Sequence, residues 1–171
     1  MADDREFTLE AFTIRPAVRS DAPAILSLIR GLAEYEHLLD ECVATTDFLE
    51  KWLFDEKKAE VLMGLADGAP VAFALFFTSF STFLGKPGLY LEDLFVKPFA
   101  RGKGFGKRIL AHLANLVVER GYGRLEWACL DWNDPSIKFY LSLDAKPLNE
   151  WTIYRLTGDA LNRLAALAGG E

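Results

Sequence analysis

The fold of this chain is decided by Leu89-Tyr-Leu-Glu-Asp-Leu-Phe-Val96 and the nearby Arg101-Gly-Lys-Gly-Phe-Gly106. The first run is extended and mostly apolar, which predicts a strand, and the second leads into a helical pattern that begins near Lys107. Its three glycines remove Cβ atoms that would keep an anion away from the backbone. The N-terminus of the following helix presents unpaired N–H groups with partial positive charge. The order strand, glycine loop, helix therefore predicts a site for a phosphate or pyrophosphate.

Two other glycine motifs do not fit this segment. A dinucleotide-binding fingerprint needs a third glycine at Lys107, and a nucleotide P-loop needs Gly-Lys-Ser/Thr after a four-residue spacer. A surface turn rich in Gly and Lys, without a ligand, is the alternative that the motif leaves open when it is taken by itself.

Composition favours one folded domain over residues 1–171. Hydrophobic residues make up 51% of the chain, which is enough for a substantial core. The N-terminus lacks the basic and then apolar layout of a secretory signal, and the longest apolar run, Val71–Phe77, is too short to span a bilayer. We therefore expect a cytoplasmic protein that does not enter a membrane.

Charge and the potential metal ligands narrow the choice of partner. The formal net charge of −6 argues against nucleic acid, which needs a basic face, and suits a small cationic substrate. Cys42 and Cys129 match neither a disulfide framework nor a metal set. His37 and His112 lack accompanying Cys or acidic ligands, so we expect no metal.

The periodicity of apolar residues predicts an α/β (α+β) fold, with one mixed sheet flanked by helices. Strands are expected at Phe7–Ile14, Glu60–Leu65, Val71–Thr78, Leu89–Val96, Arg124–Leu130 and Trp151–Leu156. Helices are expected from Asp21 to about His37, at Asp47–Phe54 behind a Thr46 cap, from Lys107 to a stop at Gly121, from Asn133 to about Leu143, and after Thr157. The pattern also predicts a hairpin turn at Asp67-Gly68 and a loop at Ser79–Gly88.

Four separate stretches resemble the GNAT acyltransferases. They are the Leu89–Val96 strand, the Arg101–Gly106 loop, which fits Arg/Gln-x-x-Gly-x-Gly/Ala, the turn Asp131-Trp-Asn-Asp-Pro-Ser136, and Phe139-Tyr140 followed by Ala145. Within that superfamily, the Tyr-Leu-Glu-Asp strand and the Trp-Asn-x-Pro-Ser turn are most similar to the spermidine/spermine (diamine) and thialysine N-acetyltransferases. The resemblance covers nearly the whole chain and implies the GNAT fold, with a mostly antiparallel sheet.

The resemblance implies that acetyl-coenzyme A (acetyl-CoA) binds at the glycine loop. The residues assigned to the coenzyme are Leu94, Phe95, Val96, Arg101, Gly102, Lys103, Gly104, Phe105, Gly106, Lys107, Asn133, Asp134, Pro135, Ser136 and Tyr140. Leu94, Phe95 and Val96 would contribute backbone N–H groups where negative charge develops on the thioester, while their side chains belong to the core. An N-cap role for Asn133 is an alternative that is compatible with the first.

Transfer to an amine requires a proton acceptor, because a lysine-like amine has a pKa of about 10.4. Glu92 and Asp93 are adjacent on the strand, so only one can face a given pocket unless the strand is irregular there. The resemblance points to Glu92, acting through water as base and as amine anchor, with Asp93 nearby. A charge pair at a solvated strand end is the alternative.

The departing thiolate benefits from a proton donor, and a phenol with a pKa of about 10 keeps its proton at neutral pH. The resemblance implies this role for Tyr140, directly after Phe139. Taken by itself, a Phe-Tyr pair on a helix is more typical of core packing.

The resemblance also implies an amine site of acids and aromatics, which would hold an extended cation by ion pairing and cation–π contact. Its residues are Tyr35, Glu36, Glu92, Asp93, Glu126, Trp127, Ala128 and Glu150. Ser79–Phe83 departs from the polyamine enzymes, because it is one residue longer and lacks their acidic residue and tryptophan; this weakens the case for spermine or spermidine. Asp144 stands where the family usually has glycine.

Together these features predict an N-acetyltransferase that transfers acetyl directly from acetyl-CoA to a primary amine in a ternary complex. The acceptor would be a small cation such as a polyamine, a diamine or a thialysine-like amino acid. The resemblance further implies a homodimer. Two alternatives stay open: acetylation of a protein N-terminus or lysine, and a non-catalytic module that binds or senses coenzyme A.

Overall fold

The computed structural model describes residue 8 and residues 10–169, so Phe7, where the first expected strand begins, lies outside the described residues. The chain divides into two compact units, with the boundary between Ala128 and Cys129. A single domain over the whole chain stays a prediction.

The first unit is built on one five-stranded sheet in the order β1-β2-β3-β4-β5. Its strands are β1 (Phe12–Pro16), β2 (Glu60–Ala66), β3 (Ala69–Ser81), β4 (Lys86–Val96) and β5 (Leu125–Trp127). The pairs from β1 to β4 are antiparallel, and β4 pairs with β5 in parallel. The expected mixed, mostly antiparallel sheet is confirmed.

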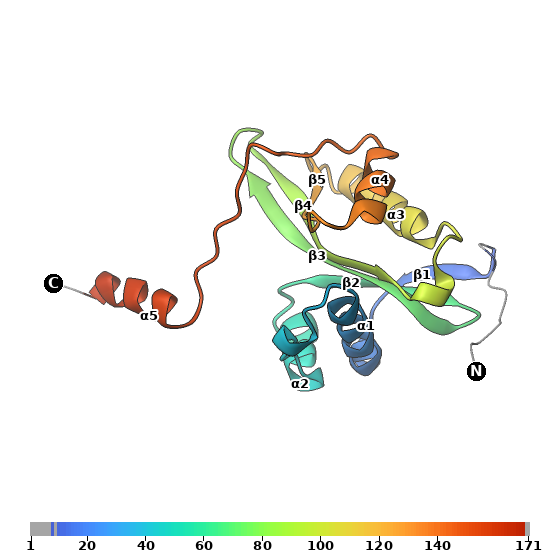
Figure 1. The fold of residues 1–171 in the computed structure, drawn as a ribbon, viewed down its shortest axis with the longest axis horizontal. Helices are drawn as coiled ribbons and strands as arrows, with labels where there is room; N and C mark the ends of the chain where they lie inside the picture. Colours follow the sequence, from blue (N-terminus) through green and yellow to red (C-terminus); the bar gives the residue numbers. More distant parts are fainter. Residues whose placement is uncertain (1–7, 9, 170–171) are drawn as a thin grey trace. The chain divides into compact units, whose positions relative to one another are not determined.

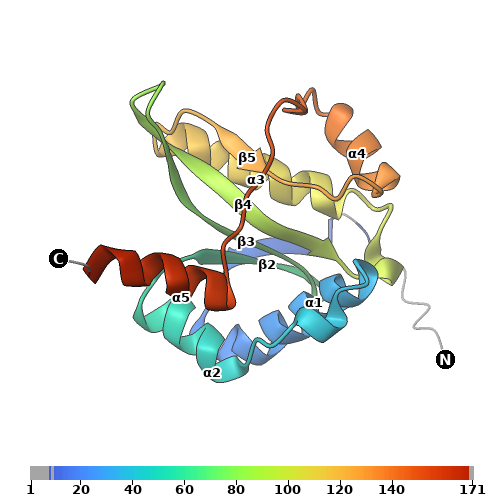
Figure 2. The same ribbon diagram turned by 60° about the vertical axis from the view of Figure 1, so that its left-hand side comes forward.

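Helices cover both faces of this sheet (Figure 1). On one face lie α1 (Ala22–Tyr35), α2 (Thr46–Leu49) and a π-helical segment (Glu50–Asp55), and on the opposite face lies α3 (Phe105–Glu119). Figure 2 shows the same two layers after a turn of the view. Short 3-10 turns lie at Arg19–Asp21, Leu39–Glu41 and Pro98–Ala100. We call the sheet face that carries α1 the α1 face.

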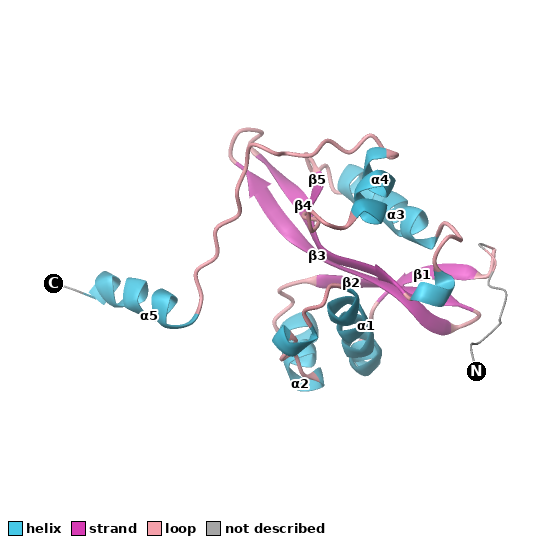
Figure 3. Cartoon of the chain, in the orientation of Figure 1, coloured by secondary structure: helices cyan, strands magenta, loops and turns pink. Residues whose placement is uncertain are grey.

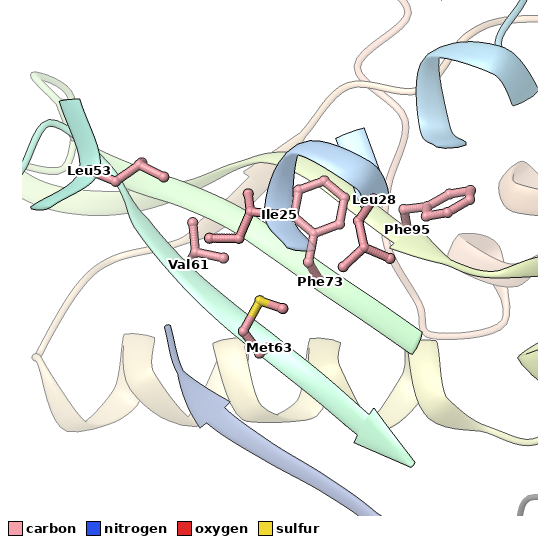
Figure 4. Close-up of a cluster of buried hydrophobic side chains, with 7 residues drawn as sticks. All are labelled: Ile25, Leu28, Leu53, Val61, Met63, Phe73 and Phe95. Carbon is pink, nitrogen blue, oxygen red and sulfur yellow. The ribbon is translucent and has the colours of Figure 1, made fainter. Parts of the chain in front are cut away.

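A cluster of buried apolar side chains fixes α1 against the sheet (Figure 4). Ile25 and Leu28 recur at helical spacing on α1, and alternate residues of the strands meet them. The cluster consists of Ile25, Leu28, Leu53, Val61, Met63, Phe73 and Phe95. Each such side chain contributes about 1.5–3 kcal/mol when it leaves water. This packing holds the C-terminal end of α1 beside β4.

The two hairpins differ from each other in how well they were predicted. Asp67 and Gly68 have φ of 49° and 78°, the left-handed pair that a tight hairpin turn requires, which confirms the β2–β3 turn. The loop expected at Ser79–Gly88 is wrong, because β3 continues to Ser81 and pairs with β4. The serines there alternate with Thr78 and Phe80, and this period of two suits a ribbon.

Several element ends also shift. Thr45, not Thr46, caps α2, because its hydroxyl accepts a hydrogen bond of 3.2 Å from the Phe48 N–H. Helix α3 begins at Phe105, two residues before Lys107. The strand expected at Arg124–Leu130 is shorter, because β5 covers only Leu125–Trp127.

The second unit contains α4 (Asp134–Leu141), α5 (Gly158–Ala166) and a 3-10 turn at Leu167–Gly169. The closing strand expected at Trp151–Leu156 is wrong: the segment is a loop without regular structure (Figure 3). A strand needs a neighbour for its backbone groups, and alternation in sequence does not provide one. Asp144, which stands where the family usually has glycine, adopts φ of 61°, a left-handed conformation that Asp tolerates better than most residues.

Candidate active site

The glycine loop joins β4 to α3 and has the backbone of an anion site. Gly102 and Gly104 have φ of 75° and 81°, a region that side chains with a Cβ occupy only at a cost. Gly104 is the N-cap of the 15-residue α3, whose first N–H groups have no partner within the helix. Lys103 and Lys107 add positive charge to the same segment. A coenzyme pyrophosphate fits these residues.

Two contacts anchor this loop to the sheet. The ring of Phe105 stacks on Phe12, with centroids 4.1 Å apart, and so fixes the start of α3. Arg101 donates a hydrogen bond of 2.9 Å from Nε to the Val96 carbonyl, and its guanidinium lies 4.4 Å from the ring centre of Tyr35. Arg101 therefore ties the loop to the last residue of α1. Its assignment to the coenzyme stays a prediction.

β4 is irregular at the two acidic residues. Leu75 of β3 pairs with Asp93, but the next residue, Phe76, pairs with Leu91, so Glu92 has no partner across the ladder. Such a bulge places two residues of one strand opposite one of its neighbour. This irregularity allows the carboxylates of Glu92 and Asp93 to face the same pocket.

The register shows which face the bulge serves. Asp93 precedes Phe95 by two residues, and Phe95 belongs to the cluster under α1, so Asp93 lies on the α1 face. Tyr90 pairs with Phe77, two residues after Leu75, and so lies on that face as well. One extra residue between Tyr90 and Asp93 brings Glu92 and Asp93 to the same side.

The electrostatics agree with this arrangement. Burial, followed by the charges of Glu92 and Glu36, raises the pKa of Asp93 to about 6. Burial also raises the pKa of Glu36, at the end of α1. The pKa of Tyr90 is raised by burial and then by the charges of Glu92 and Glu126. Four carboxyl groups, from α1, β4 and β5, therefore converge on one face of the sheet.

These carboxylates differ in their partners. Glu126 forms an ion pair with Arg124, with 2.6 Å between Oε2 and Nε. None of the ion pairs within the described part of the chain involves Glu36, Glu92 or Asp93. Grouped negative charge without a cation favours binding of one, because each charge raises the cost of ionising the others. This cluster of Glu36, Glu92 and Asp93, the acid cluster, is suited to an ammonium group.

β4 and β5 separate beside the acid cluster. Their parallel ladder covers only Leu89–Leu91 against Leu125–Trp127. Leu94, Phe95 and Val96 pair with β3 on one side and have no β5 partner on the other. Backbone groups on that open side can serve a ligand, as expected for the thioester; their use stays a prediction.

The residues expected at the amine site are not all on the α1 face. Glu126 pairs with Tyr90 and shares its face, whereas Trp127 pairs with Leu91 and lies on the other side. Ala128 follows the end of β5. Of these three, only Glu126 joins the carboxylates, and the roles of Trp127 and Ala128 stay predictions. Sequence reasoning did not include Tyr90 and Arg124, whose signal is their spacing of two from Glu92 and Glu126.

The other expected residues lie in the second unit. Asn133 caps α4, accepting a bond of 3.4 Å from the Ser136 N–H, so the capping interpretation is confirmed. Tyr140 contacts Phe139, with ring centres 5.4 Å apart, and Glu150 is exposed in the loop before α5. Asp134 and Pro135 form the first turn of α4. Their place in one site with the acid cluster stays a prediction.

The described residues form neither a metal-binding group nor a membrane-spanning helix. Residue 8 and residues 10–169 contain no group of three or more His, Cys, Asp or Glu that could hold a metal ion. Over the same residues, no helix has the length and apolar character to cross a membrane.

Comparison with known proteins decides the family. The sequence profile of the acetyltransferase (GNAT) family matches residues 26–144. The chain belongs to the GNAT family. This N-acetyltransferase is 37% identical over 166 residues to the thialysine N-epsilon-acetyltransferase of Bos taurus, a match that covers 89% of this chain and 96% of that protein. It is 42% identical over 118 residues to an L-ornithine N5-acetyltransferase of Arabidopsis thaliana, covering 69% of this chain and 48% of the relative.

Solved structures agree on the GNAT fold. An integron cassette protein of V. cholerae superposes with a TM-score of 0.77 at 26% identity, over 91% of this chain and 98% of that one. An aminoglycoside acetyltransferase from a soil metagenome reaches a TM-score of 0.74 at 20% identity, over 87% of this chain and 99% of that one, a likeness in fold alone. Acetyltransferases of this family use acetyl-CoA, and the glycine loop is suited to binding its pyrophosphate.

Proposed function

We propose that this GNAT N-acetyltransferase transfers acetyl from acetyl-CoA directly to a primary amine of a small cationic substrate, in a ternary complex. The acid cluster on the α1 face carries the proposal, because its three carboxyl groups form no ion pair within the part of the chain that the structure describes. The relatives that act on thialysine and L-ornithine, both cationic amines, support this substrate class.

Residues of the chain would bind the amine and transfer the protons of the reaction. Glu36 and Asp93 hold the ammonium group, and Glu92 removes its proton through a water molecule so that the nitrogen gains a free electron pair. Tyr140, from the second unit, would supply a proton to the departing thiolate. Acetyl-CoA supplies the activated acetyl group, held at the glycine loop and along Leu94–Val96.

A homodimer in the cytoplasm, without a nucleic-acid partner, completes the proposal. Support for the dimer comes from large apolar side chains that the second unit exposes, in the loop before α5 and on α5 itself. They are Leu148, Trp151, Ile153, Tyr154, Leu156, Leu161 and Leu164. Exposed apolar groups in such number favour burial against another surface.

A thiol-release assay tests the function. Acetyl-CoA is offered with thialysine, lysine, ornithine, short diamines, spermidine, spermine and a few peptides, and acetylated products are identified by mass spectrometry. We expect preferential turnover of one class of small amine. Turnover of peptides alone would assign a protein acceptor, and coenzyme binding by calorimetry without turnover of any amine would reject an acetyltransferase of small amines.

A further inference from the structure

Beyond the acid cluster, the α1 face continues along the β3–β4 ribbon. Ser79 of β3 pairs with Gly88 of β4, and Arg124 flanks Gly88 from the β5 side. A Cβ built on Gly88 would lie 2.9 Å from Ser79 Oγ and 3.0 Å from Arg124 Cγ. The absence of a side chain at Gly88 thus lets the stem of Arg124 lie across β4 toward the serine hydroxyl.

Two polar atoms at this place lack hydrogen bonds. Within the described part of the chain, Ser79 Oγ and Arg124 Nε are buried and have no hydrogen-bond partner. Among the described residues, Arg124 forms one ion pair, with Glu126, and Nε does not meet hydrogen-bond geometry in it. Buried polar atoms normally have a hydrogen-bond partner. Two such atoms without partners, both beside Gly88, therefore indicate a ligand that supplies the missing hydrogen bonds.

The chemistry of the three side chains defines that ligand. A guanidinium and a hydroxyl donate to a carboxylate, and a guanidinium can bind it through two parallel bonds. Glu126, beside Arg124, accepts from an ammonium group. A positive and a negative side chain next to each other are complementary to the zwitterionic head of an α-amino acid.

The distance from Glu126 to the acid cluster matches the length of a basic side chain. Glu126 is level with Tyr90, and Tyr90 is two residues before Glu92, which corresponds to about 7 Å along the strand. An extended ornithine or lysine side chain spans about 5–6 Å from Cα to its terminal nitrogen, with bonds of about 1.5 Å in staggered order. An amino acid bound at Arg124 and Glu126 would therefore place its terminal amine at the acid cluster.

We propose that Arg124, Ser79 and Glu126 form a subsite for the α-carboxylate and α-ammonium of a basic amino acid, so that the enzyme selects a diamino acid over the corresponding diamine. This inference rests on the proposed function and adds specificity-determining residues to it. It agrees with the altered Ser79–Phe83 segment, which contributes a hydroxyl instead of an acid.

Matched substrates that differ only in the carboxylate test the subsite. L-Ornithine is compared with putrescine, and L-lysine with cadaverine, by kcat/KM and by the Kd measured calorimetrically without acetyl-CoA. The native enzyme is expected to prefer each amino acid over its diamine. Arg124→Gln should lower kcat/KM for the amino acid by about ten- to a hundredfold and bring the ratio of the pair close to one.

Further variants separate recognition from folding. Arg124→Lys should recover part of the preference because it keeps the charge, and Ser79→Ala should lower the ratio by a smaller factor. Arg30→Gln, an exposed arginine on α1, is the matched control and should keep the native ratio. If circular dichroism shows that Arg124→Gln does not fold, the subsite is tested by Ser79→Ala and by the ratio of kcat/KM for amino acid and diamine in the native enzyme.

The outcomes distinguish the inference from the function beneath it. Equal efficiency for amino acid and diamine, or an equal loss for both in Arg124→Gln, would overturn the subsite while leaving an amine acetyltransferase. Absence of turnover with every amine would reject the proposed function. In that case, tighter calorimetric binding of ornithine than of putrescine would still support the subsite, and equal binding would overturn it.

Discussion

At the scale of residues, the bulge in β4 controls the chemistry. Without the extra residue, Glu92 and Asp93 would point to opposite faces, and only one carboxylate would join Glu36. Their types and positions could be predicted from the sequence. The bulge could not, because it is defined by the pairing register of β3 with β4, which depends on both strands and on the turn that joins them.

The raised pKa of Asp93 makes stability depend on pH. Its pKa of about 6 lies above the ordinary value, so the folded protein binds this proton more tightly than the unfolded chain does. The contribution to stability is complete below about pH 4 and is lost as pH rises through about 6. A shift of about two units corresponds to roughly 3 kcal/mol in the free energy of unfolding.

We expect Asp93→Asn to remove this dependence. At pH 8 the variant should be more stable than the native protein by up to about 3 kcal/mol, and near pH 4 the two should be alike. Urea unfolding at both pH values gives the free energies. Asp40→Asn, at an exposed site, serves as control. An equal difference at the two pH values would show that burial and the neighbouring carboxylates do not raise the pKa of Asp93.

Glu92→Gln should depress the rate at neutral pH by about a hundredfold or more, because the variant lacks the proton acceptor. Partial rescue is expected at high pH, where free amine accumulates. A pH–rate profile with saturating acetyl-CoA measures both effects. Native rates across the profile would remove Glu92 from the mechanism.

At the scale of elements, the strand, glycine loop and helix were predictable because each has a local signal. The apolar run, the glycines and the helical spacing are contiguous in sequence, and the structure confirms their order. The β3–β4 ribbon and the missing closing strand were not predicted. In both cases the decision depends on whether a neighbouring strand supplies hydrogen bonds, which is a tertiary property.

Gly104→Val tests the loop. The valine would be strained at φ of 81° and would obstruct the approach of an anion to the α3 N-terminus, so the Kd for coenzyme A should rise by at least about tenfold. Calorimetry measures the Kd. Gly68→Val, at φ of 78° in the β2–β3 turn, carries similar strain away from the loop and should keep native affinity. Native affinity in a folded Gly104→Val would refute the loop assignment.

At the scale of the whole molecule, the resemblance predicted the family from four short stretches, and the family profile confirms it. The first unit contains the acid cluster and the glycine loop, while Tyr140 belongs to the second. A sequence pattern assigns residues to a site through family resemblance, and it carries no information on how separate units pack.

The exposed apolar side chains of the second unit predict self-association. Light scattering after size-exclusion chromatography should give twice the mass of one chain. Ile153→Asp, a charge at a largely exposed apolar position, should shift the protein toward the monomer, and Asp159→Asn on α5 should not. A native monomer at micromolar concentration would contradict the proposed dimer.

Direct transfer to an amine is tested most directly by initial rates over a matrix of acetyl-CoA and amine concentrations, with the acetylated amine quantified against released coenzyme A. Intersecting lines in the double-reciprocal plot, with one acetylamine formed per thiol, are the predicted result. Parallel lines with an acetylated protein intermediate, or thiol release without acetylated amine, would contradict direct transfer.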